Sequence, residues 1–326
     1  MQGLRHEEEC VPCQDKIFTL TRAGVTVIAL ADGAGSAKMS HYGAESAVRA
    51  VCEELCVKFV QFVEAEDSDE VRRAVLGRVV SELEALAREK NCSVRDLGCT
   101  LLAAAADGEK LLLVHVGDGL IACCRDGRYF AASLPDNGEF VDETVFLTSS
   151  DAFQRMRLYK GKTAGISAVI LMSDGADGSF YGRKSGKFAE LLDEIKRRSV
   201  MYSPEESSAD IEELFMSEVR KKTRDDCSMI LMSRPDEYFR GYRDLCEAEQ
   251  YDFLGISSPK GKEDREKVFS ILFGREYVSR REVVSRAYSL GVDKRRVKGL
   301  LRELETGGYI EKVQYFPRRY RLNFYY

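Results

Sequence analysis

Short apolar runs bounded by glycine or aspartate recur along residues 1–235 and predict β-strands. These runs cover residues 16–21, 25–31, 100–106, 110–116, 168–173 and 227–232. Between them, apolar residues at helical spacing predict two long helices over 42–62 and 69–90 and two further ones over 186–199 and 205–222. Because the strands group around consecutive helices, the pattern indicates layered α+β structure rather than regular βαβ winding.

The C-terminal part of the chain predicts three short helices and a hairpin. A helix is expected over 264–273, Ser279 and Glu282 form a capping box for the next one, and Asp293 can cap a third. The third helix carries an apolar stripe at i, i+3, i+4 and i+7, made by Val297, Leu300, Leu301 and Leu304. With a hairpin over 309–326, this order predicts a winged helix-turn-helix domain; an unspecified small α+β cap is the alternative.

Charge also divides the chain. Residues 264–326 contain 15 Lys and Arg against 8 Asp and Glu, a balance of +7, whereas the rest of the chain carries −12 of the total of −5. We therefore predict a first domain over 1–235, a linker with a short helix over 236–263, and a winged-helix domain over 264–326. An acidic body with a basic tail indicates two modules that bind different partners.

The composition bears on the compartment. Most of the ten cysteines lie inside apolar segments, which indicates reduced core residues rather than a disulfide framework. No apolar run approaches the roughly 18–20 residues that a bilayer span requires. The first ten residues lack the apolar segment of a signal peptide. We therefore expect a cytoplasmic protein with no membrane partner.

Several aspartates follow or precede predicted strands and stand next to glycine. They occur in the pairs Asp32-Gly33 and Asp174-Gly175, the turn Gly117-Asp118-Gly119, and the pair Asp225-Asp226. A sheet fixes the backbone of a carboxylate at a strand end, and converging carboxylates repel one another unless a cation neutralises them. Hard divalent cations such as Mg²⁺ and Mn²⁺ prefer such oxygen ligands. The alternative is that each Asp-Gly pair is simply a turn.

Two further groups have simpler interpretations. Cys10-x-x-Cys13 could begin a zinc site, but no second CxxC or histidine pair follows it, so an ordinary cysteine pair is favoured. His115 lies inside an apolar run and is predicted to be a core histidine.

Six short motifs follow one another in a fixed order: Cys13-Gln14-Asp15, Asp32-Gly33-Ala34-Gly35-Ser36, Gly98-Cys99-Thr100, Gly117-Asp118-Gly119, Ser173-Asp174-Gly175 and Asp225-Asp226-Cys227-Ser228. In these motifs and their spacing, residues 3–233 resemble the metal-dependent serine/threonine protein phosphatases of type 2C. His6 and the Pro-Cys-Gln-Asp run at 12–15 are similar to the divergent bacterial branch. The resemblance implies a four-layer αββα sandwich, in which helices flank two mainly antiparallel sheets.

The resemblance also implies a set of metal-binding residues, Asp15, Asp32, Gly33, Asp118, Asp174 and Asp225. Asp32 would bridge two Mn²⁺ or Mg²⁺ ions, with the Gly33 carbonyl on the first ion. Asp174 and Asp225 would bind the second, Asp15 would hold metal-bound water, and Asp118 would contribute to a weaker third site. The implied catalytic residues are Asp32, Asp174 and Asp225, acting through a metal-activated water.

Two positions depart from the family pattern. The arginine that usually binds substrate phosphate is replaced by Cys10, and Arg5 or His6 is the candidate substitute. The glutamate common at the position of Gln14 is also absent.

The predicted function is hydrolysis of phosphoserine and phosphothreonine in a phosphoprotein substrate, and the family resemblance makes a cognate kinase a further partner. The alternative is a catalytically weak phosphatase fold that regulates an attached DNA-binding winged helix. For residues 264–326 the expected partner is DNA or a protein, and the expected nucleic-acid face is Lys294, Arg295, Arg296 and Lys298, at the start of the third helix.

Overall fold

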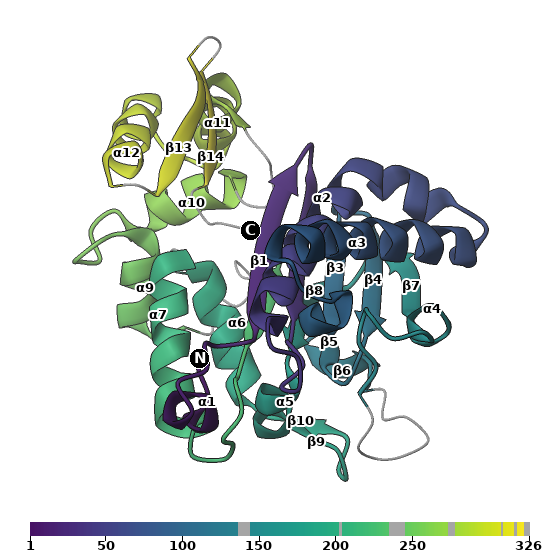
Figure 1. Cartoon of the computed structure of the whole chain (residues 1–326). Helices are drawn as coiled ribbons and strands as arrows, with labels where there is room; N and C mark the ends of the chain where they lie inside the picture. Colours follow the sequence, from purple (N-terminus) through teal and green to yellow (C-terminus); the bar gives the residue numbers. More distant parts are fainter. Residues whose placement is uncertain are drawn as a thin grey trace. The chain divides into compact units, whose positions relative to one another are not determined.

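The computed structural model describes residues 1–135, 144–201, 204–234, 245–272, 278–307, 309–315 and 318–322. The chain divides into two compact units (Figure 1). The first contains residues 1–193 and 209–232, and the second contains residues 194–208 and 233–326.

Two β-sheets form the centre of the first unit. One sheet has the order β1-β2-β3-β4-β7, with every neighbouring pair antiparallel; its strands are Lys16–Arg22, Val25–Ala31, Leu101–Ala106, Lys110–Val116 and Arg157–Lys162. The other has the order β11-β8-β5-β6, where β5 is antiparallel to β8 and β6; its strands are Met229–Ser233, Ile166–Met172, Leu120–Arg125 and Arg128–Ser133.

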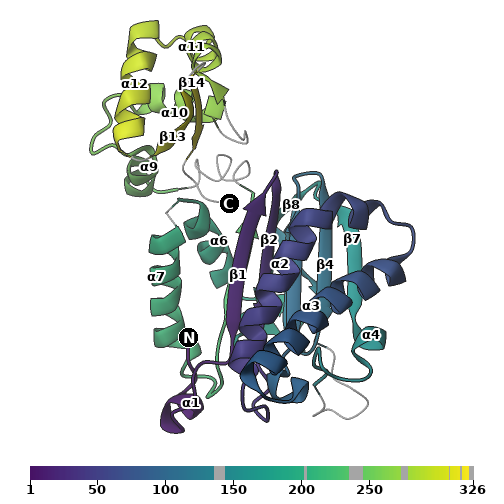
Figure 2. The same cartoon turned by 45° about the horizontal axis from the view of Figure 1, so that its top comes forward.

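The central strands β2, β3 and β4 of the first sheet are apolar on both faces, which explains their nearly continuous hydrophobic runs. In β2, Val27 and Ala29 belong to the core shared with helices α2 (Ser40–Glu64) and α3 (Ser68–Lys90). The alternate residues Ile28 and Leu30 belong to a second core shared with β5 and β8. Figure 2 shows α2 and α3 lying across this sheet. One core therefore lies between the helical layer and the first sheet, and the other lies between the two sheets.

The outer face of the second sheet is also buried. Ala122 and Ile170, which alternate with its inward-facing residues, are fully buried. On the same unit, Phe180 of α5 (Asp174–Phe180) packs at 5.8 Å between ring centroids against Phe215 of a short π-helix (Phe215–Val219). The observed fold is α+β with two antiparallel sheets between helical layers, which confirms the predicted fold class.

The short elements of the first unit are α1 (Leu4–Glu8), a 3₁₀ turn (Val94–Leu97), α4 (Ala152–Arg155), β9 (Tyr181–Gly182) and β10 (Lys187–Phe188). Helix α6 (Leu191–Met201) begins later than the predicted start at residue 186, because residues 181–188 form a hairpin. Gly186 has φ +66°, which a helix cannot contain. The predicted helix over 205–222 is α7 (Pro204–Leu214) followed by the π-helix.

The second unit contains a helical group and a small sheet. Besides the parts of α6 and α7 that lie within residues 194–208, its elements are α9 (Glu247–Leu254), α10 (Lys262–Leu272), β12 (Val278–Ser279), α11 (Arg280–Ser289), α12 (Lys294–Thr306), β13 (Ile310–Tyr315) and β14 (Arg318–Leu322). The sheet order is β12-β14-β13, antiparallel throughout. As predicted, Ser279 caps α11 by accepting the Glu282 N–H, and Asp293 caps α12.

Part of the segment predicted as a linker packs in this unit. Phe253 and Leu254 of α9 share an apolar cluster with Leu300 and Leu304 of α12. Residues 245–263 are thus part of the compact unit rather than an extended connection, and residues 236–244 lie outside the described residues. The domain boundaries at 235 and 263 remain predictions. Within the described ranges, no helix is both long and apolar enough to cross a membrane.

Candidate metal centre

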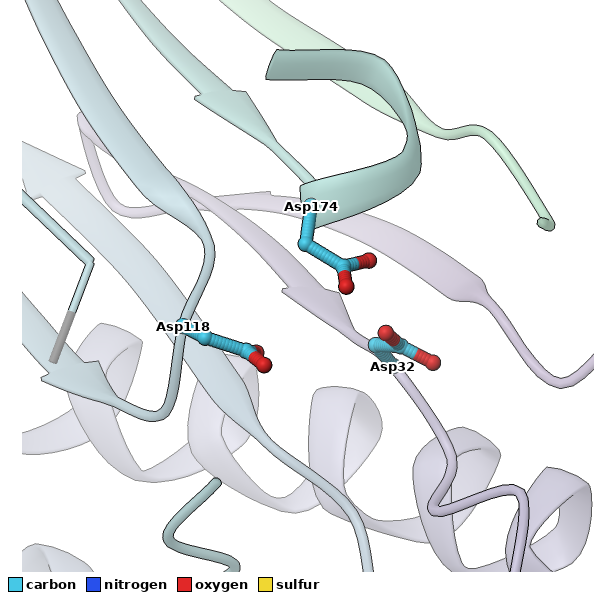
Figure 3. A group of neighbouring side chains, drawn as sticks. All are labelled: Asp32, Asp118 and Asp174. Atoms are coloured by element: carbon cyan, nitrogen blue, oxygen red, sulfur yellow. The ribbon is translucent and has the colours of Figure 1, made fainter. Parts of the chain in front are cut away.

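Three carboxylates converge at one end of the two sheets. Asp32 directly follows β2, Asp118 lies in the turn between β4 and β5, and Asp174 is the first residue of α5, just after β8. One oxygen from each lies within 4.8 Å of the others (Figure 3). Three segments that are distant in sequence therefore deliver three acidic groups to a single point.

Thr100 links two of these positions. Its Oγ1 accepts the Asp32 N–H at 2.9 Å, and its own N–H donates to the Asp32 carbonyl at 2.8 Å. Its methyl group lies against Gly117, where φ is +111° and an added Cβ would lie 2.5 Å from Thr100 Cγ2. Thr144 then donates from Oγ1 to Asp118 Oδ2 at 2.5 Å. These contacts explain why threonine and glycine occur in the two motifs.

The third carboxylate is fixed by a junction between β8 and the segment before β11. The Ser173 N–H donates to the Ser228 carbonyl at 3.0 Å, and the Ser228 N–H donates to Ser173 Oγ at 2.9 Å. A Cβ added to Gly175 would lie 2.1 Å from the Asp226 carbonyl oxygen, so only glycine permits this approach. The junction brings Asp225 close enough to Asp174 for its charge to raise the pKa of Asp174.

Asp15, which precedes β1, is buried beside this group. Both of its carboxylate oxygens, and Oδ1 of Asp174, are buried, and among the described residues none lies in hydrogen-bonding geometry with them. Burial raises the pKa of Asp15 to about 6. Burial of carboxyl oxygens without partners is costly, so these orphan oxygens indicate a missing counter-charge.

The electrostatics of the cluster support the same conclusion. Burial, and then the charges of Asp15, Asp174 and Asp118, raise the pKa of Asp32 well above its usual value. Burial and the charges of neighbouring aspartates raise the pKa of Asp174 to about 7. Mutual repulsion of this kind is relieved by a cation. The all-oxygen donor set fits Mg²⁺ or Mn²⁺.

Asp226 has a different function from its neighbour Asp225, and the sequence analysis did not separate them. It is buried, and its carboxylate accepts the N–H groups of Gly3 and Gln14, each at 2.6 Å. His6 Nδ1 lies 2.9 Å from Asp226 Oδ2. Asp226 therefore anchors the N-terminal segment and positions Gln14 immediately before Asp15. An adjacent pair of identical residues offered no signal for this division.

The two candidates for phosphate binding differ in the structure. His6 is 7% exposed and engages Asp226 through Nδ1, so it is placed to hold the N-terminal segment rather than as an exposed phosphate contact. Arg5 is exposed, and its Nε donates to Glu9 Oε1 at 3.2 Å. Of the two, Arg5 alone remains a candidate for contact with a bound phosphate.

The predicted basic residues of the second unit lie at the start of α12. Lys294, Arg295, Arg296 and Lys298 are all exposed. Arg296, however, forms ion pairs with Asp264 at 3.5 Å and Glu303 at 3.3 Å. Lys294 Nζ lies 4.5 Å from the centroid of the Tyr288 ring. The four residues therefore have unequal surroundings.

Comparison with known proteins places the first unit in a family. The sequence profile described as "Protein phosphatase 2C" matches residues 2–215. "Serine/threonine-protein phosphatase 3" of Escherichia coli (strain K12) is 28% identical over 178 residues, which is 53% of this chain and 70% of that protein. Solved structures that match the chain include an S. agalactiae serine/threonine phosphatase, at 16% identity and TM-score 0.46 over 67% of this chain and 91% of that one. Another is a bacterial serine phosphatase, at 16% identity and TM-score 0.45 over 68% and 91%.

The family profile covers well over half of the chain, including Asp15, Asp32, Asp118 and Asp174. The converging aspartates and the two-sheet architecture agree with that match. The chain therefore belongs to the protein phosphatase 2C family.

Proposed function

We propose that this serine/threonine phosphatase hydrolyses phosphoserine and phosphothreonine with two Mn²⁺ or Mg²⁺ ions bound at the aspartate cluster. Asp32, Asp174 and Asp225 are the assigned ligands, together with the Gly33 carbonyl, and Asp118 belongs to a third, weaker site. The observation that carries this proposal is the convergence of three carboxylate oxygens within 4.8 Å at the end of the sheets. The orphan oxygens of Asp15 support it.

Divalent cations bound at such a site lower the pKa of a coordinated water and neutralise charge on phosphoryl oxygens. The residues of the chain prepare the position for them. Thr100 and Thr144 hold the Asp32 backbone and the Asp118 carboxylate, so the ligands need little rearrangement on binding. Asp15, buried beside Asp32, adds negative charge from the protein side and is assigned to hold metal-bound water.

Phosphate binding in this proposal falls to Arg5. Its guanidinium is exposed on α1, and α1 is held to the cluster through the Asp226 carboxylate. The ion pair with Glu9 is exposed and therefore weak, so it does not prevent Arg5 from turning to a substrate. Cytoplasmic location and a cognate kinase partner stay predictions.

Mn²⁺-dependent turnover tests the function against its alternative, a catalytically weak regulatory domain. The full chain should hydrolyse p-nitrophenyl phosphate and a phosphothreonine peptide when Mn²⁺ is added. The activity should disappear with chelator and return with excess Mn²⁺. Calorimetric Mn²⁺ binding without turnover would instead support the regulatory alternative, and absence of Mn²⁺ binding would contradict the proposed metal site.

We propose, second, that the second unit is a winged helix that binds nucleic acid through α12. Val297, Leu300, Leu301 and Leu304 bury one side of α12, and Arg295, Lys298 and Arg302 are exposed on the other. Among the described residues these three cations have no ion pair, in contrast to Arg296. An uncompensated row of cations on a helix fits a phosphate backbone, and a protein partner is the alternative. We therefore propose Arg295, Lys298 and Arg302 as the contact face. Lys294, which lies over the Tyr288 ring, and the ion-paired Arg296 of the predicted set are left out of it.

A further inference from the structure

An exposed basic hairpin directly follows the helix that carries Asp174. Helix α5 ends at Phe180, β9 (Tyr181–Gly182) follows it directly, and a turn over 183–186 leads to β10 (Lys187–Phe188) (Figure 1). We call residues 181–188 the basic hairpin. It contains Arg183, Lys184 and Lys187, all exposed, and no acidic residue occurs between Asp177 and Glu190. It is thus a cationic protrusion that is joined to the candidate metal centre through α5.

The basic hairpin has a defined shape. The N–H groups of Ser185 and Gly186 donate to the Gly182 carbonyl at 3.0 and 2.8 Å, which closes its turn. The Phe188 ring lies 4.7 Å from the Tyr181 ring and 5.9 Å from the Tyr129 ring of β6, measured between centroids. The hairpin is therefore fastened to the second sheet, and its basic side chains project from a fixed support.

Arg183 connects the hairpin to the helix of the metal centre. Its guanidinium donates to Asp177 Oδ2 at 2.9 Å. The Asp177 side chain is 3% exposed, whereas that of Arg183 is 50% exposed. Asp177 lies one helical turn after Asp174, and the charge of Asp118 acts on it. The buried carboxylate therefore holds the guanidinium near the aspartate cluster while half of the arginine faces solvent.

The charges of the hairpin are only partly compensated. Asp177 offsets one positive charge, and within the described residues neither Lys184 nor Lys187 has an ion pair. A planar guanidinium with remaining N–H groups binds a carboxylate in two contacts, and lysine adds a flexible point charge. Such a surface would attract acidic side chains and repel basic ones.

From these observations we propose that the basic hairpin binds acidic side chains that flank the phosphorylated residue of the substrate. The inference rests on the phosphatase activity proposed above and adds a preference among phosphoproteins. Arg183, positioned by Asp177, would contact the nearest flanking carboxylate, and Lys184 and Lys187 would contact those further along.

The test compares two phosphothreonine peptides of equal length, one with glutamates and one with glutamines around the phosphothreonine. The wild-type chain should show kcat/KM about tenfold higher for the acidic peptide at low salt, and the ratio should shrink as salt rises. Lys184→Ser/Lys187→Ser should reduce the ratio to about two, and Arg183→Gln should reduce it as well.

Arg22→Ser is the matched control. Arg22 is also exposed, but it pairs with Val25 at the end of the β1–β2 pair opposite Asp32, about 20 Å of strand away. This variant should keep the wild-type ratio. An equal ratio for the two peptides in the wild type, or a high ratio in the double lysine variant, would overturn the proposal.

Two further measurements separate the causes of failure. If the double lysine variant lowered hydrolysis of p-nitrophenyl phosphate as much as that of the acidic peptide, the hairpin would act on the phosphoryl group, and the proposed contact with flanking residues would be wrong. Fluorescence anisotropy of the two labelled peptides in Mn²⁺ measures the preference without turnover. Tighter binding of the acidic peptide by a chain that lacks phosphatase activity would therefore sustain this inference while refuting the proposed function.

Discussion

His115 Nε2 lies 3.0 Å from the carbonyl oxygen of Gly117, one residue before Asp118. A carbonyl only accepts, so Nε2 carries the proton, and Nδ1 accepts from the Ser133 hydroxyl at 2.7 Å. The histidine is fully buried, as predicted for a core residue, but it also supports the turn that presents Asp118.

His115→Phe should loosen this turn. The ring volume is roughly retained, but the Gly117 carbonyl loses a buried donor, which costs about 1–3 kcal/mol of unfolding free energy. The Mn²⁺ concentration for half-maximal activity should rise, because Asp118 is held less firmly. Chemical denaturation and a Mn²⁺ titration check both effects. Ser133→Ala, which removes only the donor to Nδ1, should have a smaller effect on the titration; equal effects would contradict the assigned tautomer.

The same histidine predicts a pH dependence of stability. Burial, and then the charge of Arg157, lower the pKa of His115 from 6.5 to about 3. Between these values the unfolded chain binds the proton and the folded one does not, so stability falls as pH falls, by about 1.4 kcal/mol per pH unit in the middle of the window. Asp15 and Asp174, with raised pKa, act in the opposite sense in metal-free protein. The difference between wild type and His115→Phe, measured from pH 7 to about pH 4, isolates the histidine; parallel curves would refute the prediction.

Asp174→Asn should change stability and activity in opposite directions. Because burial and neighbouring carboxylates raise the pKa of Asp174 to about 7, its ionised form is unfavourable in the metal-free fold above that pH. The variant should therefore gain about 1–3 kcal/mol of metal-free stability at pH 8 and lose most Mn²⁺-dependent activity. Thermal melts with and without Mn²⁺ measure this. Asp193→Asn, at an exposed position, is the control and should change neither quantity.

Asp226→Ala and Asp225→Ala should differ, although the residues are adjacent. Burial alone would raise the pKa of Asp226, but hydrogen bonds from Gly3, Gln14 and His6 outweigh burial and lower it. The ionised Asp226 carboxylate therefore stabilises the fold above about pH 4, and this stabilisation is lost as the pH falls. Removing it should cost about 3–5 kcal/mol of unfolding free energy and weaken Mn²⁺ binding through displacement of Asp15.

Asp225 is exposed, and its Oδ1 accepts only the Asp226 N–H among the contacts described. Its replacement by alanine should lower Mn²⁺-dependent activity with little change in stability. Urea denaturation of both variants measures the difference in their unfolding free energies. Equal destabilisation by the two would show that the carboxylate of Asp226 is not the anchor.

The basic face of α12 predicts salt-dependent nucleic-acid binding by the full chain. If Arg295, Lys298 and Arg302 contact phosphates, binding of a duplex should weaken steeply with salt, and each single alanine variant should flatten the log–log slope by about one unit. Arg296→Ala should flatten it less, since this arginine is held by Asp264 and Glu303. Fluorescence anisotropy at several salt concentrations gives the slopes. A slope near zero in the wild type would leave a protein partner as the alternative.

Much of the fold follows from periodicity, and the remaining parts have identifiable causes. The strands around Val27 and Ala103 were predictable because both faces are apolar. Strands β5, β6 and β7 were not predicted individually. The predicted helix over 186–199 began inside the basic hairpin, because the position of Gly186 in a turn depends on contacts of Phe188 with distant aromatic rings.

At the site, the family motifs identified the aspartates that converge. The functions of the residues beside them, however, depend on contacts between distant parts of the chain. His6 and Asp226 are joined across 220 positions of sequence, a relationship that no local pattern contains. The exposed face of α12 is the opposite case. The spacing of its four apolar residues already implies that Arg302 shares a side with Arg295, so helical geometry could have identified it.

The hydrogen bond from the Gly3 N–H to Asp226 also sets an order of events during synthesis. A chain growing from its N-terminus exposes Gly3, Gln14 and Asp15 long before the ribosome adds the carboxylate that holds them in place. Strands β1 to β8 can assemble in the meantime, but the segment that positions Asp15 has no anchor until residue 226 emerges. The nascent enzyme should therefore remain silent until nearly the whole of its first unit has been translated.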